Sequence, residues 1–454
     1  LFARNNPSAT ILSVTTILSF LLVLGVLVFV HELGHFLAAR RVGIRVLTFS
    51  IGFGPRIFGF TRGGTDYCIS AVPLGGFVKM AGETTDSTDA PPTGQADEFL
   101  SKTKWERFQV LIMGPVMNLA LAVIVLAFVL YQGADVPAYR DMPPIIGGIE
   151  KSSPAAKAGL LKGDRILRVD DREVTTWDQL LLTIAGKARR EVTLLVMRGG
   201  ESRPIEVVPA ALGKYEVGDI GVYPNTHPHV RGVNPGDPAE KAGVKTGDVV
   251  IQVNDRTINF ARQLSEEISR NADKPTVVHV LRDGRPVDIH VTPVKRGALG
   301  MIGIQIGDEV KKVEPGPLEA VKMSVEQNWE NAGLIFRTLI GLFTGETSPK
   351  QLMGPVGIAQ LSGESAQNGF VPLLGLMASI SLNLGLLNLM PIPVLDGGHI
   401  LILLLEGVSR RQFSNRMKER MLIAGFVLLM LLMVTVIYND LARIQWVEHL
   451  MFWR

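Results

Sequence analysis

The sequence predicts a polytopic α-helical membrane protein with four transmembrane helices, a membrane-associated β-hairpin or sheet, and two α+β domains outside the cytoplasm. Three observations lead to this prediction. Four apolar runs are each long enough to cross a bilayer, which takes about 20 residues at 1.5 Å per residue. A soluble tandem repeat separates the second run from the third. The pattern His-Glu-x-x-His follows the first run directly, at residues 31–35.

Composition limits what the protein can bind. Its 454 residues are 47% hydrophobic, and the mean hydropathy is +0.26, so only part of the chain is expected to be soluble. The net charge of +3 and the lack of a concentrated basic run argue against nucleic acid as a partner. Cys68 is the only cysteine, which excludes an intrachain disulfide and a cysteine-based zinc site. A metal would therefore be held by His, Asp or Glu.

The first apolar run, residues 11–30, leads into the His-Glu-x-x-His pattern. On a helix His31 and His35 lie on one face, so both imidazoles can reach one metal ion. Glu32 stands beside them, where a carboxylate can take a proton from a water at the metal. A soluble metalloprotease has no reason to place its metal helix in such a run, so the pattern favours a protease that works within a membrane. The alternatives are a chance match and a cleaved signal peptide, but cleavage after Ala39 would discard the motif.

Positive charge sets the predicted orientation. The loop between the first two runs, residues 40–107, is rich in Lys and Arg, which places it in the cytoplasm and the metal toward that side. Within it, residues 50–55 and 66–79 are predicted as short strands with glycine turns. Their edge could pair with an extended substrate, or the small sheet could only brace the first helix. Residues 83–98 are predicted to form a polar loop.

An internal repeat begins after the second span, residues 110–130. Residues 153–160 recur at 237–244, and Gly163-Asp164 recurs as Gly247-Asp248, with a constant offset of 84. Two copies of one small β-rich fold are therefore expected outside the cytoplasm. We expect the domains to be 1–136 with the first two spans, 137–224 and 225–311 with the repeats, 312–369 with amphipathic helices, and 370–454 with the last two spans.

The third span, residues 370–390, supplies a third metal ligand. It ends in Asn-x-x-Pro-x-Pro-x-Leu-Asp-Gly-Gly, with Pro391 and Pro393 expected to unwind the helix. Asp396 is the predicted ligand because an aspartate at membrane depth is costly unless it is paired or metal-bound. A helix-capping role for Asp396 and ligation by His399 are the alternatives.

Two further helices are predicted near the end of the chain. The last span is expected at residues 421–437. Residues 318–343 are amphipathic and predict an interfacial helix, with a transmembrane helix as the alternative.

These motifs resemble the site-2 protease family of intramembrane zinc metalloproteases. The repeats are similar to circularly permuted PDZ domains, and together the motifs resemble the branch of Gram-negative bacteria that carries two of them. The resemblance implies that His31, His35 and Asp396 bind zinc, with Glu32 as the general acid/base. It also implies that Asn388 helps to hold the substrate. Four further residues are expected at the substrate site: Gly52, Gly54, Pro391 and Pro393.

The implied reaction is hydrolysis of a peptide bond within a transmembrane segment, in a bacterial inner membrane and as part of an envelope stress response. The resemblance suggests single-pass substrates: an anti-sigma factor already trimmed outside by another protease, and remnant signal peptides. The PDZ-like copies would be periplasmic and either filter substrates by size or capture a carboxylate at residues 220–222 or 302–304. A metal transporter or a silent scaffold is the competing class. A transporter would show more intramembrane acids and paired repeats of spans, and a scaffold would usually lack Glu32.

Overall fold

The computed structural model describes residues 13–83, 93–213, 216–296, 299–345, 347–411 and 413–442. The described chain divides into two compact units. The membrane unit contains the described residues up to Gly133, then 314–340 and those from 352 onward. The repeat unit contains residues 134–313 and 341–351. Most of the predicted polar loop, residues 84–92, lies outside the described residues.

Four described helices of the membrane unit are long and apolar enough to cross a membrane: α2 (Val14–Arg41), α3 (Lys104–Tyr131), α10 (Phe370–Asn388) and α12 (Asn415–Ala442). This confirms the prediction of four spans. The first helix is longer than predicted, because it continues past the His-Glu-x-x-His pattern to Arg41. The site therefore lies inside a continuous helix rather than at its end.

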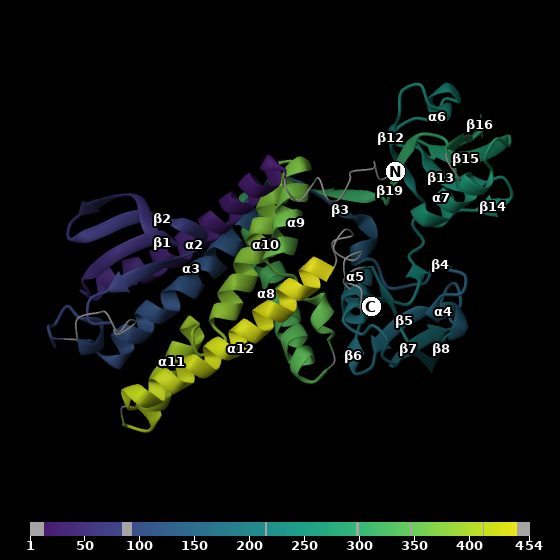
Figure 1. Cartoon of the computed structure of the whole chain (residues 1–454). Helices are drawn as coiled ribbons and strands as arrows, with labels where there is room; N and C mark the ends of the chain where they lie inside the picture. Colours follow the sequence, from purple (N-terminus) through teal and green to yellow (C-terminus); the bar gives the residue numbers. More distant parts are fainter. Residues whose placement is uncertain are drawn as a thin grey trace. The chain divides into compact units, whose positions relative to one another are not determined.

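Helices α2, α3 and α10 run side by side (Figure 1) and form the core of the membrane unit. Val23 and Leu27 of α2 are buried against Leu373, Leu374 and Met377 of α10. The helix α3 begins with a capping box, in which the side chains of Thr103 and Glu106 satisfy each other's backbone N–H groups. These contacts fix the positions of the helices that carry the motifs.

The sheet of the loop between α2 and α3 consists of two long, bent strands, β1 (Val46–Arg62) and β2 (Thr65–Met80). The strand predicted at residues 50–55 is too short, because β1 extends well beyond it on both sides. The strand predicted at residues 66–79 agrees with β2. The register folds back on itself, since Ile51 pairs with Gly76 on one side and with Ile69 on the other. A short helix, η1 (Phe99–Ser101), leads from the sheet to α3. The sheet packs on α2 through Phe36, Phe49 and Val78.

Three more helices complete the membrane unit: α8 (Pro317–Phe343), α9 (Pro355–Gln367) and α11 (Asp396–Val408). The amphipathic α8 is not among the helices apolar enough to span, which fits the interfacial prediction. The start of α9 is tied to α12, because the Asp440 carboxylate accepts hydrogen bonds from the N–H groups of Gly354 and Gly357 at 3.1 and 3.0 Å.

In the repeat unit, the first and last strands of residues 134–313 pair with each other. These strands, β3 (Ala134–Pro137) and β20 (Val310–Val313), form an antiparallel two-stranded ribbon. The first copy holds a four-stranded sheet in the order β6-β5-β7-β8. Its elements are η2 (Ala138–Asp141), β4 (Gly148–Ile149), α4 (Pro154–Lys157), β5 (Arg165–Val169), β6 (Arg172–Glu173), α5 (Trp177–Ala185), β7 (Val192–Arg198), β8 (Glu201–Val207), β9 (Ala210–Leu212), β10 (Val217–Asp219) and β11 (Val222–Tyr223).

The second copy repeats this plan around a six-stranded sheet. Each copy has its own apolar core, centred on Trp177 and Leu180 in the first and on Leu264 and Val280 in the second. The elements of the second copy are β12 (His229–Val233), α6 (Pro238–Lys241), β13 (Val249–Val253), β14 (Arg256–Thr257), α7 (Ala261–Arg270), β15 (Thr276–Arg282), β16 (Arg285–Val291), β17 (Val294–Arg296), β18 (Leu299–Met301) and β19 (Ile304–Gly307), with η3 (Pro349–Gln351) following α8.

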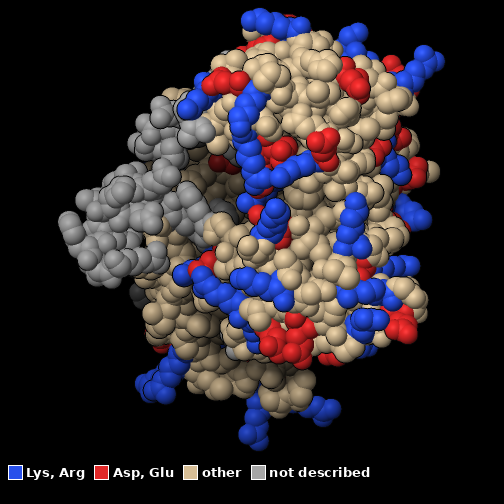
Figure 2. All heavy atoms as spheres, turned by 90° about the vertical axis from the view of Figure 1, so that its right-hand side faces the viewer, with Lys and Arg blue, Asp and Glu red and all other residues tan. Residues whose placement is uncertain are grey.

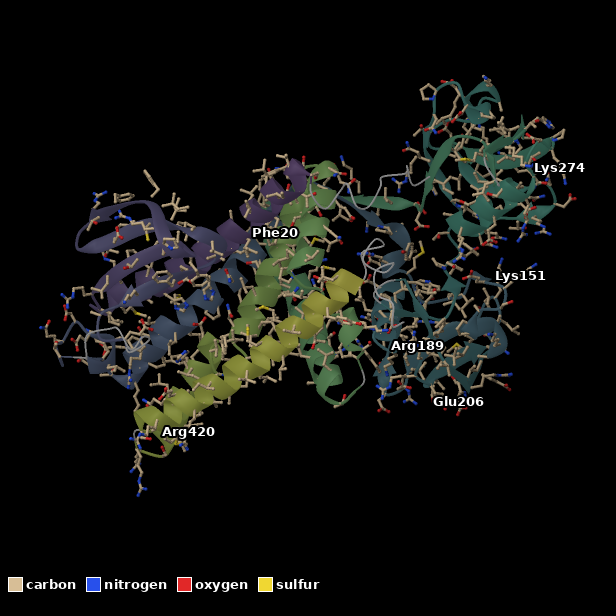
Figure 3. All side chains as sticks on the ribbon, in the orientation of Figure 1. Phe20, Lys151, Arg189, Glu206, Lys274 and Arg420 are labelled. Atoms are coloured by element: carbon tan, nitrogen blue, oxygen red, sulfur yellow. The ribbon has the colours of Figure 1, made fainter. Side chains whose placement is uncertain are left out.

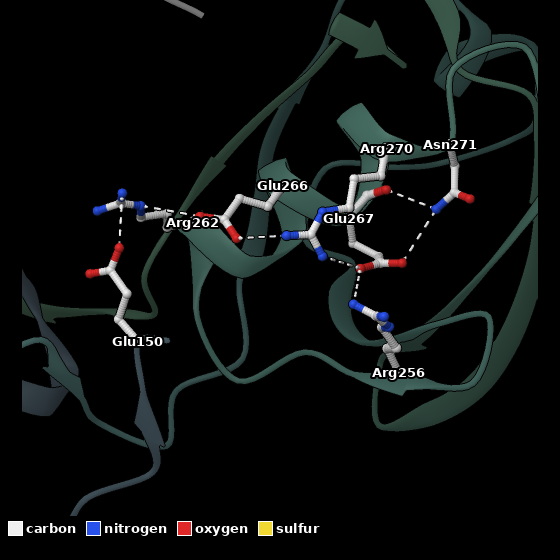
Figure 4. Close-up of polar contacts among 7 residues, drawn as sticks. All are labelled: Glu150, Arg256, Arg262, Glu266, Glu267, Arg270 and Asn271. Carbon is white, nitrogen blue, oxygen red and sulfur yellow. Dashed lines mark hydrogen bonds and ion pairs between the residues drawn. The ribbon is translucent and has the colours of Figure 1, made fainter. Parts of the chain in front are cut away.

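The two copies contact each other through charged and aromatic side chains. Arg262 of the second copy pairs with Glu150 of the first at 2.9 Å and also with Glu266 (Figure 4). Tyr223 stacks on Phe260 with ring centroids 3.9 Å apart. Charges of both signs are interspersed on the face in Figure 2, as expected of a solvated surface. Exposed charged residues labelled in Figure 3 include Lys151, Arg189, Glu206 and Lys274 of the copies and Arg420 of α12.

Candidate metal centre

Two imidazoles on one face of α2 form the first half of the site. His31 and His35 are one turn apart, and their Nε2 atoms lie 3.2 Å from each other. Both residues are buried, with 9% and 8% of their surface exposed. This is the arrangement that the i, i+4 spacing predicts, and it directs both Nε2 lone pairs to one point.

The third group comes from the chain that follows α10. Residues 389–395 are not helical, and α11 begins at Asp396. The Asp396 carboxylate faces both histidines, with Oδ2 3.1 Å from His31 Nε2 and Oδ1 3.5 Å from His35 Nε2. The capping alternative does not describe this geometry, since Leu395 is the N-cap and α11 has no side-chain cap. His399 is not part of the cluster, in which all ligand atoms lie within 4.8 Å of one another.

The cluster has the dimensions of a zinc site. Ligand atoms at about 2.0–2.1 Å from a tetrahedral zinc ion are about 3.4 Å apart. The three separations found here, 3.1, 3.2 and 3.5 Å, match that value. Two histidines and one carboxylate are a donor set of catalytic zinc sites, which leave the fourth position open. His31, His35 and Asp396 could therefore hold zinc without a change in the backbone.

Two glycines allow α3 to approach the histidines. A Cβ added at Gly34 would lie 2.4 Å from the backbone oxygen of Met113, so α2 and α3 can touch only where this side chain is absent. A Cβ added at Gly114 would lie 2.3 Å from His35 Nε2 and 2.9 Å from His31 Cε1. Any side chain at position 114 would thus fill the space beside the candidate metal-binding atoms.

The other ring nitrogens of both histidines face α3. His35 Nδ1 lies 2.8 Å from the backbone oxygen of Val110, which can accept its proton. His31 Nδ1 lies 3.2 Å from the side-chain amide of Asn118. Such outer contacts orient a metal-binding imidazole and select its tautomer.

The β-sheet passes directly over Glu32. A Cβ added at Gly76 would lie 2.8 Å from Val28 Cγ1 and 3.1 Å from Glu32 Cγ. Only glycine allows β2 to run this close to α2. The backbone of β2 therefore lies beside the one acidic side chain of the His-Glu-x-x-His pattern, on the turn that also carries the histidines.

Five predicted substrate-site residues are not joined to the cluster by any contact found in the described structure. Gly52 and Gly54 lie in a bulged part of β1 and have positive φ angles of 96° and 86°. Asn388 is the last residue of α10. Pro391 and Pro393 lie in the non-helical connection before α11, as predicted. Their assignment to the substrate site stays a prediction.

Three positions shape the site without a role predicted from the sequence: Gly76, Gly114 and Asn118. Gly114 and Asn118 belong to Gly-Pro-x-x-Asn in the second span. A polar residue at membrane depth, such as Asn118, is a signal of function that the sequence offers. Gly76 could not be distinguished from its neighbour Gly75, because only the packing of β2 on α2 shows which of them meets Glu32.

Comparisons with known proteins agree with this geometry. The sequence profile of Peptidase family M50 matches residues 19–432. The chain is 33% identical over 450 residues to protease RseP of Yersinia pestis, which covers 94% of this chain and 98% of the relative. It is 33% identical over 448 residues, with the same coverage, to the regulator of sigma-E protease RseP of Escherichia coli K12. A Vibrio cholerae relative with "zinc metalloprotease" in its name is 32% identical over 451 residues, again covering 94% and 98%. The chain therefore belongs to peptidase family M50, the site-2 protease family that its motifs resemble, and is a zinc-dependent membrane protease.

Proposed function

We propose that the chain hydrolyses peptide bonds within the transmembrane segments of single-pass membrane proteins, at the site formed by His31, His35 and Asp396. The observation that carries the proposal is the zinc-sized cluster whose two histidines lie on α2, a helix of 28 residues that is apolar enough to span a bilayer. A site at this depth meets membrane-embedded chain rather than soluble protein.

Each residue of the site has a proposed role. His31, His35 and Asp396 hold the metal, which when bound supplies Lewis-acid activation of water and of the scissile carbonyl. Glu32 takes the proton from the attacking water and delivers it to the leaving amine. Burial of this site excludes bulk water, which strengthens the electrostatic interactions that Glu32 makes.

The sheet is proposed to hold the substrate in an extended form. A transmembrane helix hides its backbone, so it must unwind before hydrolysis. The segment of β2 around Gly76 runs next to Glu32, and a substrate strand added along it would present its backbone to the metal. Asn388 is proposed to hold this strand, with Gly52, Gly54, Pro391 and Pro393 shaping its path. Four exposed apolar side chains on the same sheet suit contact with lipid: Phe53, Ile57, Phe58 and Phe60.

The proposed substrates are an anti-sigma factor trimmed outside by another protease, and remnant signal peptides. The relatives' name, regulator of sigma-E protease, supports the first, and with it a role in an envelope stress response. The positive loop before α3 supports a cytoplasmic-side site in a bacterial inner membrane. The two copies would then be periplasmic PDZ domains.

A comparison of cleavage rates tests the unwinding step. Purified protein in lipid nanodiscs would be given a transmembrane peptide with an all-leucine centre and one with Asn-Pro at the same place. We expect faster cleavage of the second peptide, because it exposes its backbone at lower cost. Equal rates for both peptides, at equal binding, would contradict an extended substrate.

We further propose that the two copies act as a size filter that excludes untrimmed substrates. One contact supports filtering over carboxylate capture. In the first copy the Gly221 N–H, a candidate carboxylate donor, already donates to Asp219 Oδ1 at 2.8 Å. A terminal carboxylate would have to displace this internal one.

Deletion of residues 144–311, with a flexible linker joining the ends, tests the filter. If the copies filter, the deleted form should cleave untrimmed substrate. Asp219→Ala is the matched control, since it frees the Gly221 N–H without changing the size of the copies and should leave selectivity as it is. If the deleted form kept its zinc but failed to cut even trimmed substrate, activation by ligand capture would be favoured instead.

A further inference from the structure

We propose that Asn118 is a positioning residue that fixes His31 in the tautomer whose Nε2 binds zinc. The inference rests on the proposed function, in which His31 is a metal ligand. It assigns a role to the Gly-Pro-x-x-Asn motif of α3, which the roles proposed for the zinc ligands, Glu32 and the substrate site leave unused.

The direction of the imidazoles sets the requirement. Both Nε2 atoms point toward Asp396, so both must be unprotonated to bind a metal. The proton of each neutral ring then resides on Nδ1. For His35 the acceptor of that proton is the backbone oxygen of Val110, 2.8 Å away. His31 needs an acceptor too, and the group within reach is the side chain of Asn118.

The Asn118 amide can meet this requirement with its oxygen. Its Nδ2 lies 3.2 Å from His31 Nδ1, which sets two donors against each other when Nδ1 carries the proton. Its Oδ1 is buried and, within the described residues, has no hydrogen-bond partner. Exchange of the two amide atoms by a turn about χ2 places Oδ1 at His31 Nδ1, and such an exchange leaves the shape of the side chain unchanged.

The surroundings of Asn118 hold it in place. The residue is fully buried, and its backbone oxygen accepts a hydrogen bond from Ser381 Oγ of α10 at 2.7 Å. A polar side chain in the interior of a membrane helix bundle is costly unless it has a partner. For Asn118 the side-chain partner is a ring nitrogen of a proposed zinc ligand, His31.

Zinc affinity of three full-length variants tests the inference, measured by competition with a chelator in detergent. Asn118→Leu has similar size but no acceptor, and we expect about 10- to 100-fold weaker zinc binding. Asn118→Asp keeps only acceptor atoms, and we expect affinity close to wild type. Ser381→Ala removes a buried hydrogen bond to the same residue without touching His31 and should also bind as wild type.

The pattern across the variants separates positioning from packing. A packing role would make Asn118→Asp, which buries a charge, at least as damaging as Asn118→Leu. If Asn118→Leu bound zinc as wild type does, or if folded Asn118→Asp lost zinc, the inference would be overturned. Should Asn118→Leu fail to fold, Asn118→Asp alone decides. Wild-type protein without zinc, or His31→Ala with full zinc, would instead overturn the proposed site itself.

Discussion

Two aspartates of this chain, Asp164 and Asp396, have different kinds of partner. Asp164 of the first copy accepts two hydrogen bonds from Arg198, both of 2.7 Å, and one from the Leu161 N–H. The same arrangement recurs in the second copy between Asp248 and Arg282. Asp396 of the membrane unit instead faces two imidazole nitrogens.

The two carboxylates differ in whether a positively charged side chain of the protein neutralises them. A guanidinium neutralises Asp164 in a bidentate pair, so this aspartate needs no ligand. The two imidazoles that face Asp396 carry no charge in their neutral form. When both Nε2 atoms are unprotonated, as metal binding requires, their lone pairs face the carboxylate oxygens. A cation between the three groups removes this repulsion, and the separations fit zinc. The pair of Asp164 and Arg198 stabilises a fold, whereas the group of Asp396, His31 and His35 has the donor set and the dimensions of the proposed zinc site.

Removal of one imidazole should have the largest effect. We expect His31→Ala to lose both zinc and proteolysis, because two ligands cannot hold a catalytic zinc ion. Zinc content of the purified variant, by elemental analysis, and cleavage of a transmembrane peptide check this. Full zinc occupancy in this variant would remove His31 from the site.

A methyl group beside the ring nitrogens proposed to bind zinc should have the next largest effect. Gly114→Ala puts a Cβ 2.3 Å from His35 Nε2, so we expect most of the bound zinc and the activity to be lost. Gly375→Ala on α10 is the matched control, because a Cβ there meets no atom within 4 Å. The account predicts unchanged zinc content for the control. Normal zinc binding by Gly114→Ala would mean that α3 does not approach the histidines as described.

Loss of the ion pair between Asp164 and Arg198 should reduce the stability of the first copy without changing zinc binding. Asp164→Asn leaves Arg198 without its charge partner, and we expect a loss of about 2–3 kcal/mol in the first copy, reduced because Arg198 is partly exposed. Hydrogen exchange of the β5 and β7 amides measures this. Glu206→Gln, an exposed change on β8, should have no effect. Zinc loss on Asp164→Asn would contradict the separation of roles.

The ion pair between Asp164 and Arg198 also predicts that the stability of the first copy depends modestly on pH. Hydrogen bonds from Arg198 lower the pKa of Asp164 below its ordinary value. Its contribution to stability is therefore complete above the unfolded pKa of about 3.9 and is lost as pH falls through the lower folded pKa. Thermal unfolding of the copies should show this loss in acid, with a shallower slope for Asp164→Asn. Equal slopes in the two proteins would contradict it.

Much of the membrane unit follows from local patterns. Apolar length predicted all four spans, and the i, i+4 spacing predicted that His31 and His35 share one face, because both depend only on helix geometry. Asp396 was chosen because a charge at membrane depth needs a partner. The internal repeat includes both the aspartates of Gly-Asp and the arginines Arg198 and Arg282, but it does not show that they pair.

The rest depends on contacts between distant segments. The fold-back register of β1 and β2 comes from tertiary packing on α2, which no local pattern records. Gly76 and Gly114 matter only because of what a Cβ would meet. The PDZ character of the copies and their periplasmic position remain predictions.

The central claim is that Glu32 performs proton transfer at a zinc site built by His31, His35 and Asp396. The most direct test is the cleavage rate of a transmembrane peptide by Glu32→Gln protein whose zinc content has been measured in the same sample. The account predicts one zinc per chain and a rate lower by about 10²- to 10⁴-fold, since the change removes a base but no ligand. Wild-type turnover by the zinc-loaded variant would show that another group carries out the chemistry.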